Sequence, residues 1–154
     1  KPVVGSDMSG LRESPQRRRA AVNVASWAPA QHGGMQTPRT LWTIGHSTHT
    51  WAAFLRLLED AGVEAVADVR LMAGSRRYPQ FNSGALSGAL AAAGIRYLPL
   101  RDLGGRRQPR PDSPNTAWRD PAFRGYADYM QTDGYRRARE RLARAAGRER
   151  TALM

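Results

Sequence analysis

Cysteine is absent from this 154-residue chain, so no disulfide can contribute to its stability, and the absence fits a reducing compartment. Long apolar runs are also missing. No stretch approaches the length of a membrane span, and the N-terminus lacks the apolar middle region of a secretory signal. These absences predict a cytoplasmic protein with no membrane partner.

Histidine is scarce as well, with His32, His46 and His49 as the three examples. No close pair of carboxylates accompanies the latter two, so the sequence offers no recognisable metal site. A Walker loop and a dinucleotide fingerprint are also missing, because Gly104-Gly105 follows a predicted strand without leading directly into a helix. We therefore expect neither a metal nor a cofactor.

Positive charge is abundant, and the formal net charge is +11 at pH 7. Only five of the 24 basic and two of the 13 acidic residues precede position 35, so the excess belongs to the rest of the chain. A basic domain is typical of proteins that bind nucleic acid or another polyanion. Near-total use of arginine over lysine in an alanine- and glycine-rich chain is also typical of a GC-rich genome, so the charge can also reflect codon usage alone.

The length fits a single domain. Residues 1–38 contain several prolines and glycines and the run Arg17-Arg18-Arg19, without a sustained apolar periodicity. They predict a disordered leader or an upstream read-through that precedes a start at Met35. A basic arm that binds nucleic acid is the alternative. Residues 39–154 are then expected to form one α/β domain.

Short apolar runs and amphipathic segments alternate within this domain. The runs at residues 41–47 and 64–69 predict two strands, and the segment between them predicts a helix with Thr50 as its N-cap and Gly62 after its end. Later helices are expected over residues 84–93, 121–130 and 134–146, with Ser83, Asp120 and Asp133 as N-caps, a third strand over 95–98 and the start of a fourth at 151–154. This order predicts a three-layer α/β sandwich with a mainly parallel sheet whose C-terminal strand is truncated.

Polar side chains stand where the first two strands end. His46 and Ser47 follow the first strand, and Arg70 follows the second. Two long loops add further candidates, which are Ser75, Arg76, Gly105 and Arg106. Because ligands bind outside the carboxyl ends of parallel strands, we predict a pocket there. Arginine forks and glycine-rich backbone suit phosphate or carboxylate groups, so the predicted ligand bears a phosphate.

The predicted catalytic residues are His46 and Arg70. His46 can accept and donate a proton near neutral pH, and the alternative is a hydrogen bond that closes the turn after the strand. Arg70 would hold the anion, and the alternative is a structural ion pair with Asp68 or another carboxylate. Asp68 itself interrupts an apolar strand, so a buried carboxylate there must be paired or hydrogen-bonded and is expected to give structural support. A Ser-His triad is not expected, because adjacent strand residues such as His46 and Ser47 point apart.

The order of the motifs resembles a known family. The motifs are Thr43-Ile44-Gly45-His46-Ser47, Asp68-Val69-Arg70, Ser75-Arg76-Arg77, Pro79-Gln80-Phe81-Asn82, Gly94-Ile95-Arg96-Tyr97, Leu103-Gly104-Gly105-Arg106 and Phe123-Arg124-Gly125-Tyr126-Ala127. From about Leu41 to Met154 the chain resembles the bacterial and archaeal family catalogued as domain of unknown function 488. The resemblance implies a three-layer α/β domain with no settled biochemical activity.

The resemblance also implies two differences from typical relatives. They usually continue past the fourth strand into a Cys-Ala-Glu segment and a Cys-His-Arg segment, so the chain is expected to be cut before part of its polar site. Relatives often have an aromatic residue and a proline before the Gly-Ser-Arg segment, where this chain has Leu71, Met72 and Ala73. Without that proline the loop is expected to be freer to move.

Together these observations predict an uncharacterised domain that acts as an enzyme on a phosphorylated small molecule, a nucleotide or nucleic acid. The alternative is a non-catalytic nucleic-acid-binding module, which would use the arginine-rich face of the last helix and stacking by Tyr78, Phe81 and Trp118. A structural or partner-binding protein, whose strand ends only close turns, is the third possibility. The sequence leaves open whether the protein is an enzyme.

Overall fold

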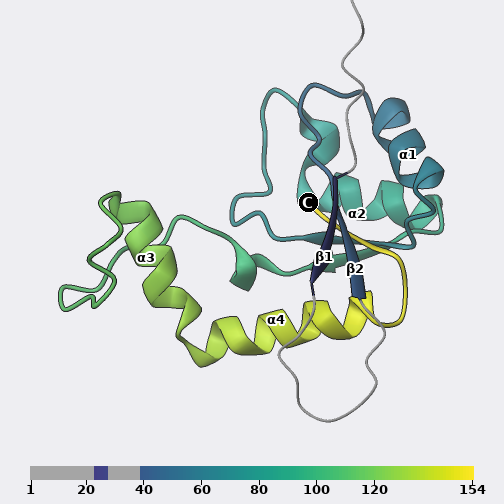
Figure 1. Ribbon diagram of the computed structural model, residues 1–154. Helices are drawn as coiled ribbons and strands as arrows, with labels where there is room; N and C mark the ends of the chain where they lie inside the picture. The colour runs from purple at the N-terminus through teal and green to yellow at the C-terminus, as the bar shows by residue number, and fades with distance from the viewer. Residues whose placement is uncertain (1–22, 28–38) are drawn as a thin grey trace, which may run out of the picture.

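The computed structural model describes residues 23–27 and 39–154. These residues contain a five-stranded sheet in the order β1-β2-β5-β3-β4 (Figure 1). Four strands run parallel, which are β2 (Arg39–Thr43), β3 (Ala65–Asp68), β4 (Arg96–Pro99) and β5 (Thr151–Leu153). The short β5 occupies the centre, and it pairs with β2 on one side and β3 on the other. The predicted mainly parallel sheet is confirmed.

The remaining strand, β1 (Asn23–Trp27), pairs antiparallel with β2. It lies inside the segment that the sequence predicts to be disordered, so that prediction is wrong for residues 23–27. The physical reason is that β5 covers only one edge of β2, and the backbone groups of the other edge need partners that β1 supplies. The rest of the predicted leader, residues 1–22 and 28–38, lies outside the described residues.

Helices precede or follow the parallel strands as the sequence predicts. They are α1 (Trp51–Asp60), α2 (Ser83–Ala92), α3 (Pro121–Met130) and α4 (Asp133–Ala146), with short 3-10 turns η1 (Pro79–Phe81) and η2 (Arg101–Leu103). None of the helices in the described part of the chain is long and apolar enough to cross a membrane.

Two of the predicted N-caps are confirmed and two are wrong. Thr50 Oγ1 accepts the amide of Ala53 at 3.2 Å, and Asp120 Oδ1 accepts two amides at the start of α3. Ser83 and Asp133 are instead the first residues of α2 and α4. The caps of these helices are Asn82 and Thr132, whose backbones are extended as an N-cap requires. In both cases two polar residues that can cap a helix stand next to each other, and the prediction took the second instead of the first, so both predicted helices start one position too late.

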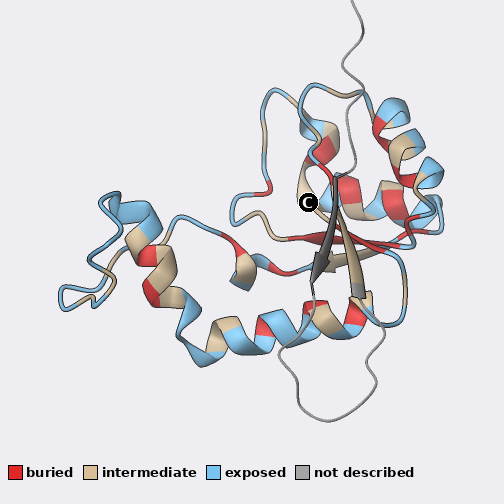
Figure 2. Cartoon of the chain, in the orientation of Figure 1, coloured by how far each residue is buried: buried red, intermediate tan, exposed pale blue. Residues whose placement is uncertain are grey.

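The helices cover both faces of the sheet. Figure 1 shows α1 and α2 on one side and α4 on the other. Successive residues of β3 alternate between the two layers: Val66 packs in a cluster with α1 and α2, and Ala67 packs with Leu142 of α4. Figure 2 shows the buried residues concentrated in the sheet and on the inner faces of these helices. The three-layer α/β arrangement follows from this alternation.

Candidate functional site

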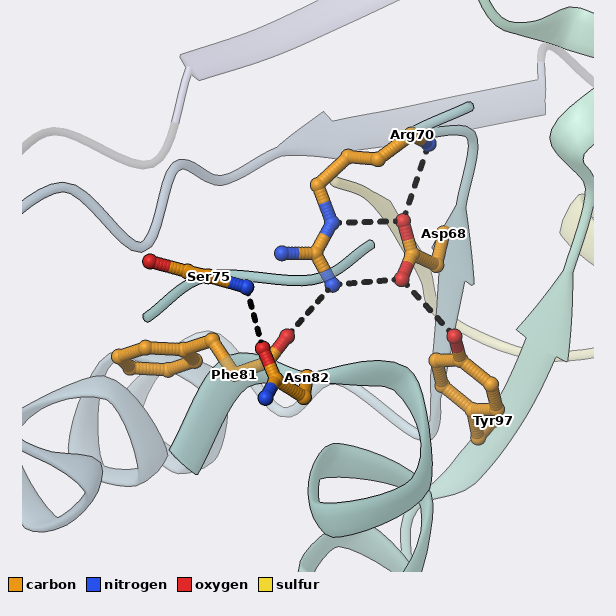
Figure 3. A network of polar contacts seen from close by, with 6 residues as sticks. All are labelled: Asp68, Arg70, Ser75, Phe81, Asn82 and Tyr97. Carbon is orange, nitrogen blue, oxygen red and sulfur yellow. Dashed lines mark hydrogen bonds and ion pairs between the residues drawn. The ribbon is translucent and has the colours of Figure 1, made fainter. Parts of the chain in front are cut away.

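The carboxyl end of β3 carries a buried ion pair. The Asp68 side chain is only 1% exposed, and the Arg70 side chain is one-fifth exposed. Arg70 binds it with two nitrogens, Nε to Oδ1 at 2.8 Å and Nη2 to Oδ2 at 2.7 Å, and the Arg70 amide donates to Oδ1 at 3.0 Å (Figure 3). Side chains two positions apart on an extended strand point to the same side, so the pair forms within one short segment. The expected pairing of the Asp68 carboxylate is confirmed.

Two further residues complete this network. Tyr97 of β4 donates its hydroxyl to Asp68 Oδ2 at 2.8 Å, and Arg70 Nη2 also donates to the carbonyl of Phe81 at 2.9 Å (Figure 3). The network therefore connects the end of β3 to β4 and to η1. Two of the three guanidinium nitrogens of Arg70 are used in these contacts, which is the geometry of a structural ion pair.

The network also fixes the protonation of its members. Burial by itself would raise the pKa of Asp68, but the hydrogen bonds from Arg70 and Tyr97 outweigh it and lower that pKa below the ordinary value. The pKa of Arg70 is raised by its hydrogen bond to Asp68. Burial and the hydrogen bond to Asp68 raise the pKa of Tyr97 to about 12. At neutral pH, Asp68 is therefore ionised, Arg70 is charged and Tyr97 is neutral.

The lowered pKa of Asp68 predicts a pH dependence of stability. A carboxyl group with a depressed folded-state pKa stabilises the fold above its unfolded-state pKa, and this contribution is lost as the pH falls through the folded-state value. We expect the contribution to be complete above about pH 5, to decrease as the pH falls further, and to disappear only below the lowered folded-state pKa. Urea unfolding from pH 7 to pH 2.5 should show a shallower acid decline for Asp68→Asn than for the unmodified protein. Parallel pH profiles would contradict the depressed pKa.

A pocket lies beside this network, between the loops that follow β3 and β4. Its volume is about 490 Å³, and three residues of the predicted site line it, which are Arg70, Gly105 and Arg106. The other lining residues are Val69, Leu71, Met72, Gly74, Leu103 and Gly104. No aspartate or glutamate is among these described lining residues, so the only formal charges at the pocket wall are those of two arginines.

Glycine at position 104 permits the two loops to approach. A Cβ atom at Gly104 would lie 2.5 Å from the carbonyl oxygen of Val69 and 3.1 Å from the amide nitrogen of Leu71. Any side chain would therefore push the loop after β4 away from the loop after β3. Gly105 has no atom within 4 Å of such a position, so its backbone borders open space. Arg106 follows with a φ of +59°, and its Nη1 contacts the sulfur of Met72 at 3.7 Å.

His46 and Ser47 do not line this pocket. The His46 ring stacks on Phe81, with centroids 4.9 Å apart and planes inclined by 13°. Its Nδ1 lies 3.0 Å from the Ser47 carbonyl oxygen, and Ser47 has a φ of +41° in the turn that follows β2. This contact agrees with the alternative in which His46 closes the turn. Phe81 nevertheless links the two predicted catalytic residues, because its ring touches His46 and its carbonyl accepts from Arg70.

Ser75 and Arg76 also lie outside the pocket lining. The amide of Ser75 donates to Asn82 Oδ1 (Figure 3). Ser75 Oγ accepts the amide of Tyr78, so Ser75 closes the loop before α2. Arg76 is exposed and takes part in no ion pair formed within residues 39–154. The structure therefore places Arg70, Gly105 and Arg106 around one cavity and leaves the other four predicted residues outside its lining.

Sequence reasoning missed Tyr97 and misjudged Phe81. Tyr97 stands opposite Val66 in the parallel register, two positions before the partner of Asp68, so it shares the face of the carboxylate. Knowledge of the β3–β4 pairing would have identified it. Phe81 is predicted to stack on bases, and that prediction is wrong because the side chain is fully buried. Within the described residues, no group of three or more histidine or acidic side chains could hold a metal ion.

Comparison with known proteins gives one family match. The model of the family described as Domain of unknown function DUF488 matches residues 50–154. This segment contains the Asp68–Arg70–Tyr97 network and every residue that lines the pocket. No curated protein and no solved structure matches the chain.

Proposed function

The chain belongs to the DUF488 family, and from this premise we propose that it binds a phosphate-bearing ligand in the pocket between the loops after β3 and β4. One observation carries the proposal. At the ends of two adjacent parallel strands, Arg70, Arg106 and a glycine backbone border one cavity whose lining contains no described carboxylate. Ligands of α/β proteins bind at this edge of the sheet, and guanidinium groups with accessible amides suit phosphate oxygens.

The size of the pocket favours a small molecule or a nucleotide over a bare anion. A volume of about 490 Å³ falls within the range of about 300–1,000 Å³ that is typical of small-molecule sites. The apolar side chains of Val69, Leu71 and Leu103 would contact the uncharged part of such a ligand. Arg106 is the natural first contact for the phosphate, because it is exposed and Asp68 already holds two nitrogens of Arg70.

The enzymatic part of the proposal assigns proton transfer to His46 and contact with the anion to Arg70. Its support is the partly exposed position of His46 next to Phe81, which also bonds Arg70. Ser47, Ser75 and Arg76 would then contact parts of the substrate that extend beyond the pocket. Imidazole is the side chain best suited to acid or base catalysis near neutral pH.

Two arginines offer a matched test of ligand binding. Arg106→Gln should weaken binding of pyrophosphate or a nucleoside monophosphate by about 1.5–3 kcal/mol, because a charge-assisted hydrogen bond is lost. Arg56→Gln removes the same charge from an exposed position on α1 outside the pocket lining and should change affinity by less than about 0.5 kcal/mol. Isothermal titration calorimetry at constant ionic strength measures both. Equal losses in the two variants, or no binding by the unmodified protein, would refute the pocket.

The alternative function is a nucleic-acid-binding module with aromatic side chains that stack on bases. Trp118 is 52% exposed and could stack in this way, whereas Phe81 is buried in the core and could not. The salt dependence of binding separates this alternative from the small-ligand pocket. Binding through several backbone phosphates should weaken on the order of 10³-fold between low and physiological salt. A small ligand held in the pocket should lose much less.

A further inference from the structure

A second cavity lies on the other side of β4, between this strand and α4. We call it the α4–β4 groove; four arginines line it, Arg96, Arg141, Arg144 and Arg148, above a floor that includes Leu98 and Ala145. Its volume is about 250 Å³. None of these residues lines the pocket proposed above, so the groove is a separate feature.

The sequence periodicities explain why the arginines converge. Positions 141, 144, 145 and 148 follow helical spacing and form one stripe along α4 and its C-terminal end. Arg96 and Leu98 are two positions apart on β4 and therefore share the face of the sheet that is turned towards α4. Where α4 packs against the edge strand β4, the residues between them thus change from leucine and alanine to arginine.

Positive charge exceeds negative charge in the groove. Arg96 is paired with Glu149, and Arg144 approaches Glu140 at 3.7 Å. Arg141 and Arg148 take part in no ion pair within the described residues 39–154, and no carboxylate is among the lining residues described there. Because β4 is the edge strand of the described sheet, no strand among residues 23–27 and 39–154 closes the outer side of the groove. The guanidinium groups of Arg141 and Arg148, which have no ion-pair partner there, add uncompensated positive charge to the groove unless an anion neutralises them.

We propose that the α4–β4 groove binds the sugar-phosphate backbone of a nucleic acid strand. From Arg141 to Arg144 the helical rise is about 4.5 Å, and Arg148 follows in the turn after α4, so the arginines stand in a row rather than around one point. Charges distributed along a line suit a repeating phosphate chain better than a single phosphate group. No aromatic side chain and no asparagine or glutamine is among the described lining residues, so the groove contacts phosphates without reading bases.

Fluorescence anisotropy with a labelled 20-nucleotide poly(dT) strand tests this proposal. The double variant Arg141→Gln/Arg148→Gln should bind about tenfold or more weakly at 50 mM salt, and the slope of log affinity against log salt should fall by about 1.4, which is the loss of two phosphate contacts on a single strand. The matched control is Arg56→Gln/Arg139→Gln. It removes the same charge from α1 and from the side of α4 that is rotated about 200° from Arg141.

The outcomes distinguish a strand bound in this groove from an effect of net charge and from a small-anion site. Equal affinity and salt slope for the two double variants would overturn the proposal, because the effect would then be that of net charge alone. Binding of pyrophosphate that is lost in Arg141→Gln/Arg148→Gln, without any binding of poly(dT), would also overturn it in favour of a small-anion site. Poly(U) should bind as poly(dT) does, since phosphates are the contacted groups. The pocket proposal is tested separately by calorimetry of Arg106→Gln with a nucleoside monophosphate, so failure here is distinguishable from failure of that proposal.

Discussion

Replacement of Arg70 with methionine should lower the free energy of unfolding by about 3 kcal/mol, because it leaves the buried Asp68 carboxylate without its charged partner. Removal of one partner from a buried ion pair typically costs about 3–5 kcal/mol. We expect the lower end of this range, because the Tyr97 hydroxyl and the amide of residue 70 still donate to the carboxylate. Urea denaturation monitored by circular dichroism at pH 7 measures the change. The carbonyl of Phe81 also loses a donor, so η1 should become more mobile.

A double-mutant cycle gives the control. Asp68→Asn removes the negative charge while keeping an oxygen acceptor, so the double variant Asp68→Asn/Arg70→Met should be less destabilised than the sum of the single variants. Additive effects would show that the two side chains do not stabilise each other. Because Arg70 supports the fold in this way, its replacement confounds ligand affinity with stability, whereas Arg106 is exposed and suits a binding test better.

Replacement of Gly125 with alanine should destabilise the packing of α3 by about 3 kcal/mol. An added Cβ atom would lie 2.1 Å from the carbonyl oxygen of Arg107 and 2.6 Å from its carbon. These are backbone atoms that no rotamer change can move, so α3 must shift away from the loop. Amide hydrogen exchange within α3 should accelerate roughly a hundredfold, which corresponds to that free energy.

Gly88→Ala is the matched control for this prediction. Gly88 also lies within a helix, but no atom approaches an added Cβ there within 4 Å, so alanine should stabilise the protein by about 0.5–1 kcal/mol through helix propensity. Similar effects of the two substitutions would contradict the close approach at Gly125.

The consequence of Gly125→Ala should reach the proposed pocket. Tyr126 of α3 donates its hydroxyl to the carbonyl of Leu103 at 2.9 Å, and the guanidinium of Arg107 lies 3.8 Å from the ring centroid of Tyr129. These contacts hold the loop that carries Gly104, Gly105 and Arg106. A shift of α3 should therefore weaken ligand binding in the pocket although Gly125 is not among its lining residues.

Local chemistry made much of this architecture predictable. Thr50 and Asp120 are N-caps because their short side chains can accept amides of the first helical turn, and Gly62 follows α1 with a φ of +61°. Alternating apolar runs and helical periodicities predicted the four parallel strands and the helices on both faces. The pairing of Asp68 with a nearby arginine was predictable as well, because a buried carboxylate needs a partner and Arg70 is two positions away.

Other features depend on segments that are far apart in the sequence. No local pattern states that β5 enters between β2 and β3, that β1 pairs with β2, or that Tyr97 reaches Asp68 from the neighbouring strand. The predicted set of seven site residues was drawn from strand ends and loops as if all of them faced one cavity. The Ser75 hydroxyl accepts the Tyr78 amide within its own loop, and the His46 ring stacks on Phe81, so only part of the set meets at the pocket.

The sequence by itself thus determined the class of fold, the helix boundaries to within a residue and the positive character of the strand ends, because these follow from residue type, period and spacing over a few positions. Tertiary structure alone decided which cationic side chains share a cavity. Arg106 faces the pocket with Arg70 because Gly104 allows two loop backbones to touch, and Arg96 joins Arg141 and Arg148 because strand and helix pack against each other. Such convergence depends on the register and packing of distant segments, which short-range patterns do not encode.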